Sequence, residues 1–175
     1  MPIKKKLSKE ELLKEFEQLV VWVETLKKYS EKNFNLPISK GKWSVAEIIS
    51  HLMFWDRYIL EETLPYMKQN ADIKSIEFQE LNDKASEYSL SGVTVKTLID
   101  QFIEGRNVLV SKLREKSEEE FSVHFKINGE EVDPYSGYPH TIFNYISSFL
   151  WHDNHHKNQV VEFFNNEYSH EHQVK

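Results

Sequence analysis

Four segments of the chain carry apolar residues at helical spacing, and this periodicity constrains the fold more than any other feature of the sequence. The first segment places apolar side chains three or four positions apart from Leu12 to Leu26. That spacing lays one apolar stripe along a helix, and the stripe must pack against another element to be buried. The other three segments lie at residues 44–65, 94–113 and 141–165. The pattern therefore predicts an all-α protein.

Polar residues at the starts of these segments explain where the helices begin. Ser44 can accept a hydrogen bond from a backbone amide of the first turn, while the Glu47 side chain reaches back to the amide of Ser44. Serine or threonine occupies the same position before the other segments, at Ser8, Thr94 and Thr141. Each helix is therefore expected to begin at a defined residue.

The connections between the segments differ in character. Residues 71–91 are polar and irregular, and they predict a long crossover after the second helix with about one turn of helix. In residues 117–140, Phe121, Val123 and Phe125 alternate with polar residues, and Asn128-Gly129 favours a tight turn because both positions accept positive φ. We expect a small extended hairpin or flap before the fourth helix. The whole pattern predicts an antiparallel four-helix bundle.

The chain length suits one domain. A chain of 175 residues buries about two-thirds of its unfolded surface and folds without covalent staples. We expect a single domain over residues 1–175, structured over about 8–165, with a polar tail at 166–175.

Composition excludes several classes of function. The chain has no cysteine and eight histidines. Disulfides, cysteine-ligated zinc, iron–sulfur clusters and a cysteine nucleophile are therefore excluded, and any metal must be bound by His, Asp or Glu. The 22 basic and 28 acidic residues give a net charge of −6, without the basic face of a nucleic-acid binder.

Membrane association is also not expected. The apolar runs are only a few residues long, well below the roughly 20 residues needed to cross a bilayer. The basic cluster Lys4–Lys6 is not followed by the apolar core of a signal peptide. We expect a cytoplasmic protein with a small-molecule substrate and no nucleic-acid or membrane partner. A monomer and a homodimer both stay open.

The last segment carries histidines that can act together. His152 and His156 are four positions apart, so they lie about 40° from one another around a helix and can face one object. His155 is turned roughly 120° away and is expected in solvent or at a helix interface elsewhere. Two imidazoles at this spacing form a bidentate site for zinc, nickel, copper, iron or cobalt. The same spacing also fits histidines that only make hydrogen bonds.

His51 is the candidate for a third ligand. It lies two turns into the second helix, on the flank shared with Ile48 and Trp55, and can face the bundle interior near the fourth helix. A packing role is the alternative. Three histidines from two helices would form a facial three-nitrogen site with open positions, as catalytic metal sites have.

These residues match a known family. The segment 43–47 (Trp-Ser-Val-Ala-Glu), followed by His51 and, on the last helix, by His152, His156 and Gln159, resembles the DinB superfamily, also called YfiT-like metal-dependent hydrolases. The resemblance implies a four-helix bundle in which these three histidines bind a divalent metal, most often nickel or zinc.

The resemblance also implies a range of activities. Some members of the family resemble thiol S-transferases that use bacillithiol, mycothiol or glutathione, and related ones isomerise maleylpyruvate. We expect a metal-dependent thiol S-transferase or hydrolase acting on a small electrophile, with a low-molecular-weight thiol as a candidate co-substrate. The alternative is a non-catalytic, stress-related bundle that binds metal or a small molecule. Asn158 departs from the family, whose members often carry glycine there.

Two residues of the last helix are weaker candidates for catalysis. Asp153 can orient a ligand or act as a base, although a carboxylate bonded to water or Lys157 is the simpler interpretation. Gln159 can support a ligand or the substrate in the same way.

Other polar and aromatic residues allow two interpretations each. Asp56 is expected to be a charge on the helix surface. An anionic group of a cofactor can be bound by Arg57, Tyr58 and Arg106, although arginines on bundle surfaces are usually only solvated. A pocket wall can be formed by Trp55 and Trp151 beside the histidines, or these residues can pack in the core.

Overall fold

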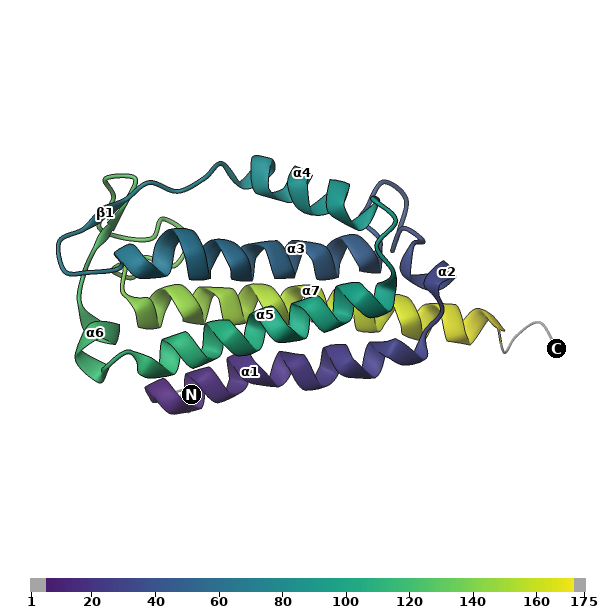
Figure 1. Cartoon of the computed structure of the whole chain (residues 1–175), viewed down its shortest axis with the longest axis horizontal. Coiled ribbons are helices and arrows are strands. Elements are labelled where there is room, and N and C mark those ends of the chain that lie inside the picture. The colour runs from purple at the N-terminus through teal and green to yellow at the C-terminus, as the bar shows by residue number, and fades with distance from the viewer. Residues whose placement is uncertain (1–5, 172–175) are drawn as a thin grey trace.

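The computed structural model of the chain describes residues 6–171 and the side chains up to residue 167. Four long helices lie side by side in it (Figure 1): α1 (Lys9–Thr25), α3 (Val45–Tyr58), α5 (Val95–Glu115) and α7 (Ile142–Glu171). The predicted four-helix bundle is confirmed. Helices α1 and α7 run in one direction and α3 and α5 in the other (Figure 1).

The helices begin where the capping residues predict. The side chain of Ser44 accepts from the Glu47 amide at 3.2 Å, and Glu47 Oε2 accepts from the Ser44 amide at 2.8 Å. Ser8 begins α1 with the same capping box. The hydroxyls of Thr94 and Thr141 accept from amides in the first turns of α5 and α7. Local sequence thus fixes the start of every long helix.

Irregular helical turns extend the first two long helices. Helix α1 continues as a 3₁₀ turn, η1 (Leu26–Lys28), which is followed by the short helix α2 (Glu31–Phe34). Helix α3 continues as a π turn, η2 (Ile59–Thr63), and a 3₁₀ turn, η3 (Leu64–Tyr66). The α-helix therefore does not continue to Pro65, whose missing amide disfavours it, and the 3₁₀ turn ends one residue later at Tyr66.

The crossover after α3 is more ordered than the sequence predicts. It contains the three-turn helix α4 (Phe78–Ser89), where about one turn is expected. Its buried residues, Leu81, Ala85 and Ser89, stand four apart and are mostly small, so they form only a thin stripe against α3. The crossover spans the length of the bundle (Figure 1), which is why α5 begins at the same end as α3.

The segment before α7 combines a helix with a flap. Phe121 lies in a short helix, α6 (Glu118–Ser122), capped by Ser117, so the interpretation of this stretch as a strand is wrong. The turn at Asn128-Gly129 is confirmed, because both residues have positive φ and the backbone pairs across them. The strand β2 (Lys126–Ile127) pairs in parallel with β1 (Asp72–Ile73) of the crossover.

Helix α7 is longer than expected. It continues beyond Asn165 to Glu171, because no proline or glycine follows to stop it. Residues 172–175 of the expected tail lie outside the described residues.

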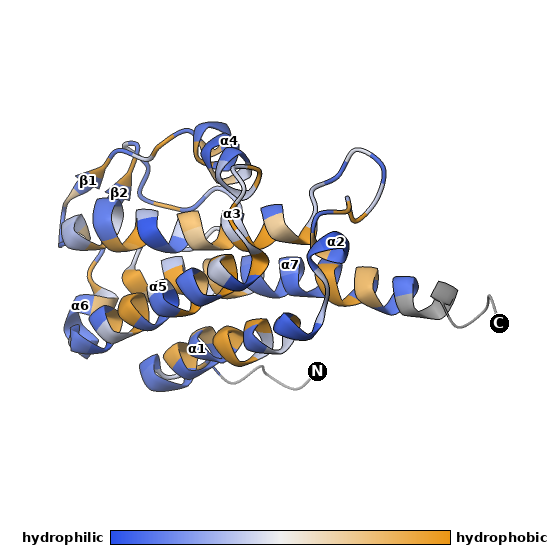
Figure 2. Cartoon of the chain, turned by 45° about the vertical axis from the view of Figure 1, so that its right-hand side comes forward, coloured by the Kyte–Doolittle hydropathy of each residue, from blue (hydrophilic) through white to orange (hydrophobic). Residues whose placement is uncertain are grey.

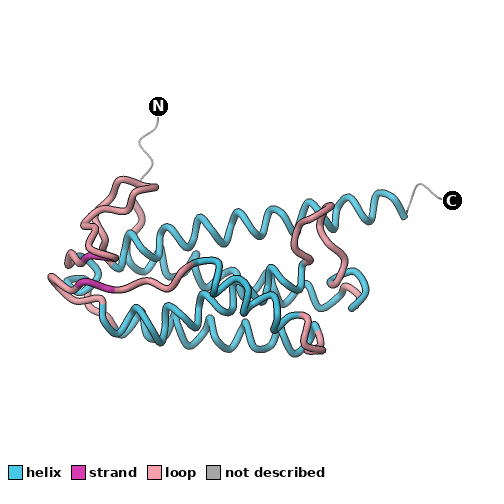
Figure 3. Tube along the Cα trace, turned by 90° about the horizontal axis from the view of Figure 1, so that it is seen from above, coloured by secondary structure: helices cyan, strands magenta, loops and turns pink. Residues whose placement is uncertain are grey.

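Seen from above, the loops gather at the two ends of the bundle (Figure 3). No helix in the described part of the chain is long and apolar enough to span a membrane.

Apolar side chains fill the space between the long helices. In Figure 2, hydrophobic (orange) and hydrophilic (blue) residues alternate along each of these helices. The core consists of two main clusters, one toward each end of the bundle. On α5, Phe102 belongs to one cluster and Leu109 to the other. Arg106 stands between them on the same helix and is wholly buried. A charged layer therefore lies between the two halves of the core.

Candidate metal centre

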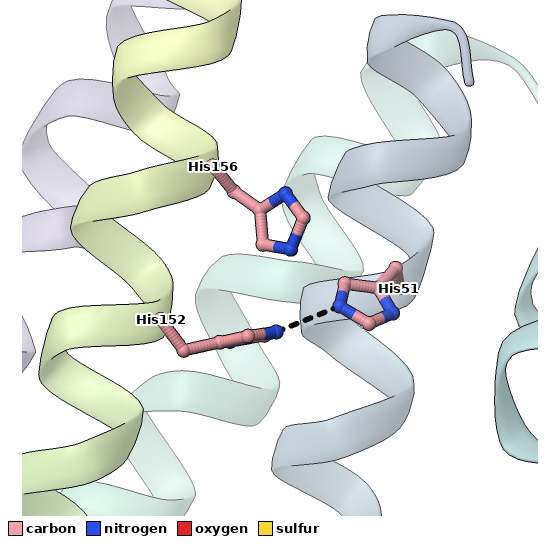
Figure 4. A group of neighbouring side chains, drawn as sticks. All are labelled: His51, His152 and His156. Carbon is pink, nitrogen blue, oxygen red and sulfur yellow. Dashed lines mark hydrogen bonds between the residues drawn. The ribbon is translucent and has the colours of Figure 1, made fainter. Parts of the chain in front are cut away.

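Three histidines from two helices meet inside the bundle. His51 projects from α3, and His152 and His156 project from α7 toward it (Figure 4). One nitrogen of each ring lies within 4.8 Å of the other two, and Nε2 of His51 is 2.9 Å from Nε2 of His152. His51 is 5% exposed, and the other two are half-buried. The convergence predicted from the sequence spacing is therefore present.

Asn82 of α4 determines which nitrogen of His51 faces this cluster. Its Oδ1 lies 2.9 Å from Nδ1 of His51 and accepts from Nε1 of Trp55 at 3.3 Å. Indole nitrogen can only donate, so the shared atom of Asn82 must be an oxygen, and Nδ1 of His51 must carry the proton. Nε2 of His51 is therefore left with a free lone pair directed at the other histidines.

Gln159 determines in the same way which nitrogen of His156 faces the cluster. Its Oε1 accepts from Nδ1 of His156 at 2.8 Å, one turn along α7. The proton on Nδ1 leaves Nε2 of His156 as an acceptor. Side-chain amides thus select the same tautomer in two of the three rings. This contact with His156 is the one that the supporting role expected of Gln159 requires.

The environment keeps these rings uncharged. Burial, together with the smaller effects of His152 and His156, lowers the pKa of His51 to about 3. Burial, followed by the effect of His152, lowers the pKa of His156 to about 4. Both imidazoles are therefore neutral at pH 7, the form in which histidine binds metals.

The donor set fits a divalent transition-metal ion. Two imidazole nitrogens on one tetrahedral zinc ion lie about 3.3 Å apart, given Zn–N bonds of about 2.0–2.1 Å. The 2.9 Å separation of the Nε2 atoms of His51 and His152 is close to that value. Among the described residues, the ligand group holds three nitrogens and no carboxylate. Such a set leaves coordination positions for water or substrate.

Aromatic rings surround the cluster. The ring centroid of Trp43 lies 4.8 Å from that of His51, and the ring of Phe149 lies 5.6 Å from that of His152. Trp55 is buried against the same wall, in line with the packing role allowed by the sequence. Trp151 is 71% exposed and stacks on His155, so it neither packs in the core nor lines the cluster.

His155 behaves as its position on the helix predicts. It is exposed, and its ring centroid lies 5.7 Å from that of Trp151 with the two planes nearly parallel. It takes no part in the ligand group. His124 and His140 belong to the flap region, while the side chains of His170 and His172 lie outside the described residues.

The charged candidates are placed differently from the sequence expectation. Asp56 is 3% exposed and therefore not a surface charge, and Arg106 is wholly buried rather than solvated. Arg106 donates to both Asp56 and Asp153. This ion pair replaces the expected contact of Asp153 with water or Lys157. Arg57 is exposed, and the hydroxyl of Tyr58 accepts from the backbone at 2.8 Å.

Sequence reasoning missed Asn82 and the charged layer, for different reasons. Asn82 stands in the crossover, where the thin stripe gave little periodicity. Arg106 had a usable signal, because it follows Phe102 by four positions and precedes Leu109 by three. It therefore occupies a place in the apolar stripe, and a charge there must be paired.

Comparisons with known proteins agree with this fold. A family model described as the DinB superfamily matches residues 5–160. Among solved structures, YfiT from Bacillus subtilis superposes with a TM-score of 0.70 at 16% sequence identity, over 95% of this chain and 93% of that one. That protein is described as a probable metal-dependent hydrolase with an unusual four-helix bundle topology. No curated protein matches the chain.

Proposed function

The chain belongs to the DinB superfamily, and on that premise we propose that it is a metal-dependent enzyme whose His51, His152 and His156 bind one divalent ion. The proposal rests mainly on the protonation and orientation of the histidine nitrogens that would bind the ion. Two rings are neutral, and their Nδ1 atoms are held by amide oxygens, so that Nε2 faces the cluster. Hydrogen-bonded support of this kind is typical of metal-binding histidines.

We propose hydrolysis of a small electrophile as the reaction, in line with the description of YfiT. A divalent ion held by three nitrogens supplies Lewis acidity and lowers the pKa of a water molecule or thiol at its open positions. The chain contributes the three ligands and a wall of aromatic rings. Trp43 and Phe149 lie close enough to the histidines to exclude bulk water and to orient an apolar part of the substrate.

Thiol transfer is the second candidate, and one observation favours it. Within the described residues, the ligand group contains no carboxylate that could serve as a base, and Asp153, which lies beside His152, is paired with Arg106. A thiol loses its proton near pH 8.5, far more easily than water does, and so depends less on such a base. The chain has no cysteine, so the thiol would be a co-substrate such as bacillithiol or glutathione.

The metal proposed is nickel or zinc, because neutral imidazole nitrogens suit both. The small-molecule substrate and the cytoplasmic location expected from the sequence remain part of the proposal. The alternative function is that of a non-catalytic bundle, which binds metal or a small molecule without catalysing a reaction.

Metal analysis of untagged protein tests the site. We expect about one ion per chain in the wild-type protein and negligible metal after His51→Ala, His152→Ala or His156→Ala. His155→Ala is the matched control, because His155 lies on the same helix but is exposed, and it should retain metal. Equal and negligible metal in the wild-type protein and the His156→Ala variant would sink the proposal.

Thermal unfolding provides an independent measurement of binding. Free metal at 100 times its Kd stabilises the native state by about 2.7 kcal/mol, so the wild-type Tm should rise on adding Zn²⁺ or Ni²⁺. The His155→Ala variant should show the same rise and the His156→Ala variant should not.

A substrate panel separates the reactions. Metal-loaded protein is assayed with ester and amide substrates alone, and with chlorinated aromatic acceptors plus bacillithiol or glutathione. Turnover without thiol supports the hydrolase, and turnover that requires thiol supports the transferase. Metal binding without turnover in either assay would favour the non-catalytic bundle.

A further inference from the structure

Arg106 is the largest fully buried side chain of the protein among the described residues, and it donates hydrogen bonds from α5 to each of the other three long helices. From α5 it donates to Asp56 on α3 at 2.7 and 2.9 Å and to Asp153 on α7 at 2.9 Å. It also donates to the backbone carbonyl of Phe16 on α1 at 2.9 Å. One guanidinium faces two carboxylates, so the layer has an excess of one negative charge.

The two carboxylates use their oxygens differently. Both Oδ1 and Oδ2 of Asp56 accept hydrogen bonds from Arg106 in a bidentate pair. Only Oδ2 of Asp153 accepts from Arg106, and Oδ1 of Asp153 lies 3.6 Å from Nδ1 of His152. Because Oδ2 is anchored to a rigid donor, the direction of Oδ1 is set as well. One oxygen of the charged layer therefore faces a ring of the histidine cluster.

The hydrogen bonds of the cluster determine where His152 carries its proton. Nε2 of His51 is an acceptor, since Nδ1 of His51 carries the proton and donates it in a hydrogen bond to Oδ1 of Asn82. The 2.9 Å contact between the two Nε2 atoms is then a hydrogen bond in which His152 donates. Nδ1 of His152 is buried and has no hydrogen-bond partner among the described residues. A bare nitrogen is consistent with that position, whereas a proton on it would lack an acceptor.

Metal binding would reverse this arrangement. Nε2 of His152 can bind an ion only after it has lost its proton, and the neutral ring then carries the proton on Nδ1. At Nδ1 the proton points toward Oδ1 of Asp153. A movement of a few tenths of an ångström brings this pair within hydrogen-bond distance.

We propose that Asp153 is a positioning residue for His152, held by Arg106 to accept the Nδ1 proton when Nε2 of His152 binds a metal ion. This inference rests on the proposed metal site. It goes beyond that site because it assigns a function to the buried Arg106–Asp153 pair, which the three ligands alone do not require.

The substitutions Asp153→Asn and Asp56→Asn form a matched pair for testing it. Each removes one charge and one carboxylate from Arg106 without changing the side-chain volume. In the Asp153→Asn variant, Arg106 is purely a donor and must take the amide oxygen, so the NH₂ group turns to Nδ1 of His152. A donor at that place stabilises the tautomer with the proton on Nε2, which cannot bind metal.

The measurement is the Kd for Zn²⁺ by competition with a chelating dye, with folding checked by circular dichroism. We expect Asp153→Asn to weaken binding by about 10- to 100-fold and Asp56→Asn to leave it within about 3-fold of the wild-type value. Equal losses in both variants, or none in Asp153→Asn, would overturn the inference while leaving the metal site intact. Absence of binding in the wild-type protein would instead refute the proposed function.

A second measurement uses the wild-type protein and so does not depend on how the variants fold. Long-range ¹H–¹⁵N spectra of histidine-labelled protein report which nitrogen of each ring carries a proton. We expect the proton of His152 to move from Nε2 to Nδ1 on adding Zn²⁺ and to resonate far downfield, as a proton shared with a carboxylate does. A Zn²⁺-loaded His152 without a proton on Nδ1 would contradict the inference.

Discussion

A single amide oxygen, that of Asn82, decides which nitrogen of His51 faces the other two histidines. It lies 31 positions away in sequence, on a helix that the apolar pattern did not predict. The three histidines could be found from the sequence because helical spacing and cap position determine their direction. Their hydrogen-bond partner could not, because its contact depends on how the crossover packs against α3.

Removing that oxygen should weaken metal binding. We expect Asn82→Ala to raise the Kd for Zn²⁺ by about 10- to 100-fold, because the ring of His51 loses the partner that fixes its tautomer. Asn82→Asp keeps an acceptor oxygen at the same place and should bind at least as tightly as the wild type. The dye competition assay checks both variants, and a similar loss in the two would show that Asn82 acts in another way.

The neutral rings also predict how stability depends on pH in metal-free protein. The pKa of His51 is lowered to about 3, while in the unfolded chain it stays near 6.5. Below about pH 6.5 the unfolded state therefore binds more protons than the folded state. The contribution of His51 to the unfolding free energy is thus fully present above that pH and is lost as the pH falls. His156 acts in the same direction.

Urea unfolding in the presence of a chelator, between pH 7.5 and 5, measures this loss. The unfolding free energy of the wild-type protein should fall more steeply with decreasing pH than that of His51→Gln, whose side chain does not titrate. Parallel pH profiles of the two proteins would contradict the expectation.

At the scale of the helices, the apolar stripes were predicted well and their charged interruptions were not. On α5 the stripe Phe102, Arg106, Leu109 and Leu113 keeps the spacing of four, three and four. Periodicity alone gives the direction of Arg106, but the sequence does not show which carboxylates meet it. The strand predicted at Phe121 failed because Ser117 and Glu120 cap a helix there, and this local chemistry outweighs two-residue alternation.

Gly105 offers a test of local helix energetics on α5. Its φ is not positive, and a Cβ added there meets no atom within 4 Å. Gly105→Ala should therefore raise the unfolding free energy by about 0.5–1 kcal/mol. Gly92→Ala is the contrasting variant, because Gly92 has a φ of 95° and alanine there should lower stability. Urea titration checks the signs, and a loss of stability in Gly105→Ala would show hidden crowding on α5.

At the scale of the whole molecule, the charged layer around Arg106 joins the four long helices at one point. Buried ion pairs of this kind contribute little compared with apolar packing, but breaking one leaves a charge without a partner. Burial raises the pKa of the Asp56 carboxyl, and Arg106 opposes this effect. Of its two carboxylates, only Asp153 also lies beside a histidine of the cluster, with Oδ1 3.6 Å from Nδ1 of His152.

Arg106→Met should therefore be strongly destabilising. We expect a loss of about 3–5 kcal/mol in unfolding free energy at pH 7, which lessens at lower pH because the stranded carboxyls then take up protons. Arg114→Met is the control, since Arg114 also lies on α5 and pairs with two glutamates but is 37% exposed in its side chain. That variant should lose less than about 1 kcal/mol. Equal losses in urea titrations would contradict the distinction between buried and exposed pairs.

The histidines that meet in the bundle are far apart along the chain, with 101 positions between His51 and His152. During synthesis, α3 is made long before α7, so His51 has no partner histidines until α7 has been made. Neither helix can hold an ion with three nitrogens by itself. Metal uptake therefore cannot guide the early steps of folding, and a bound ion would report that the final helix has docked in register.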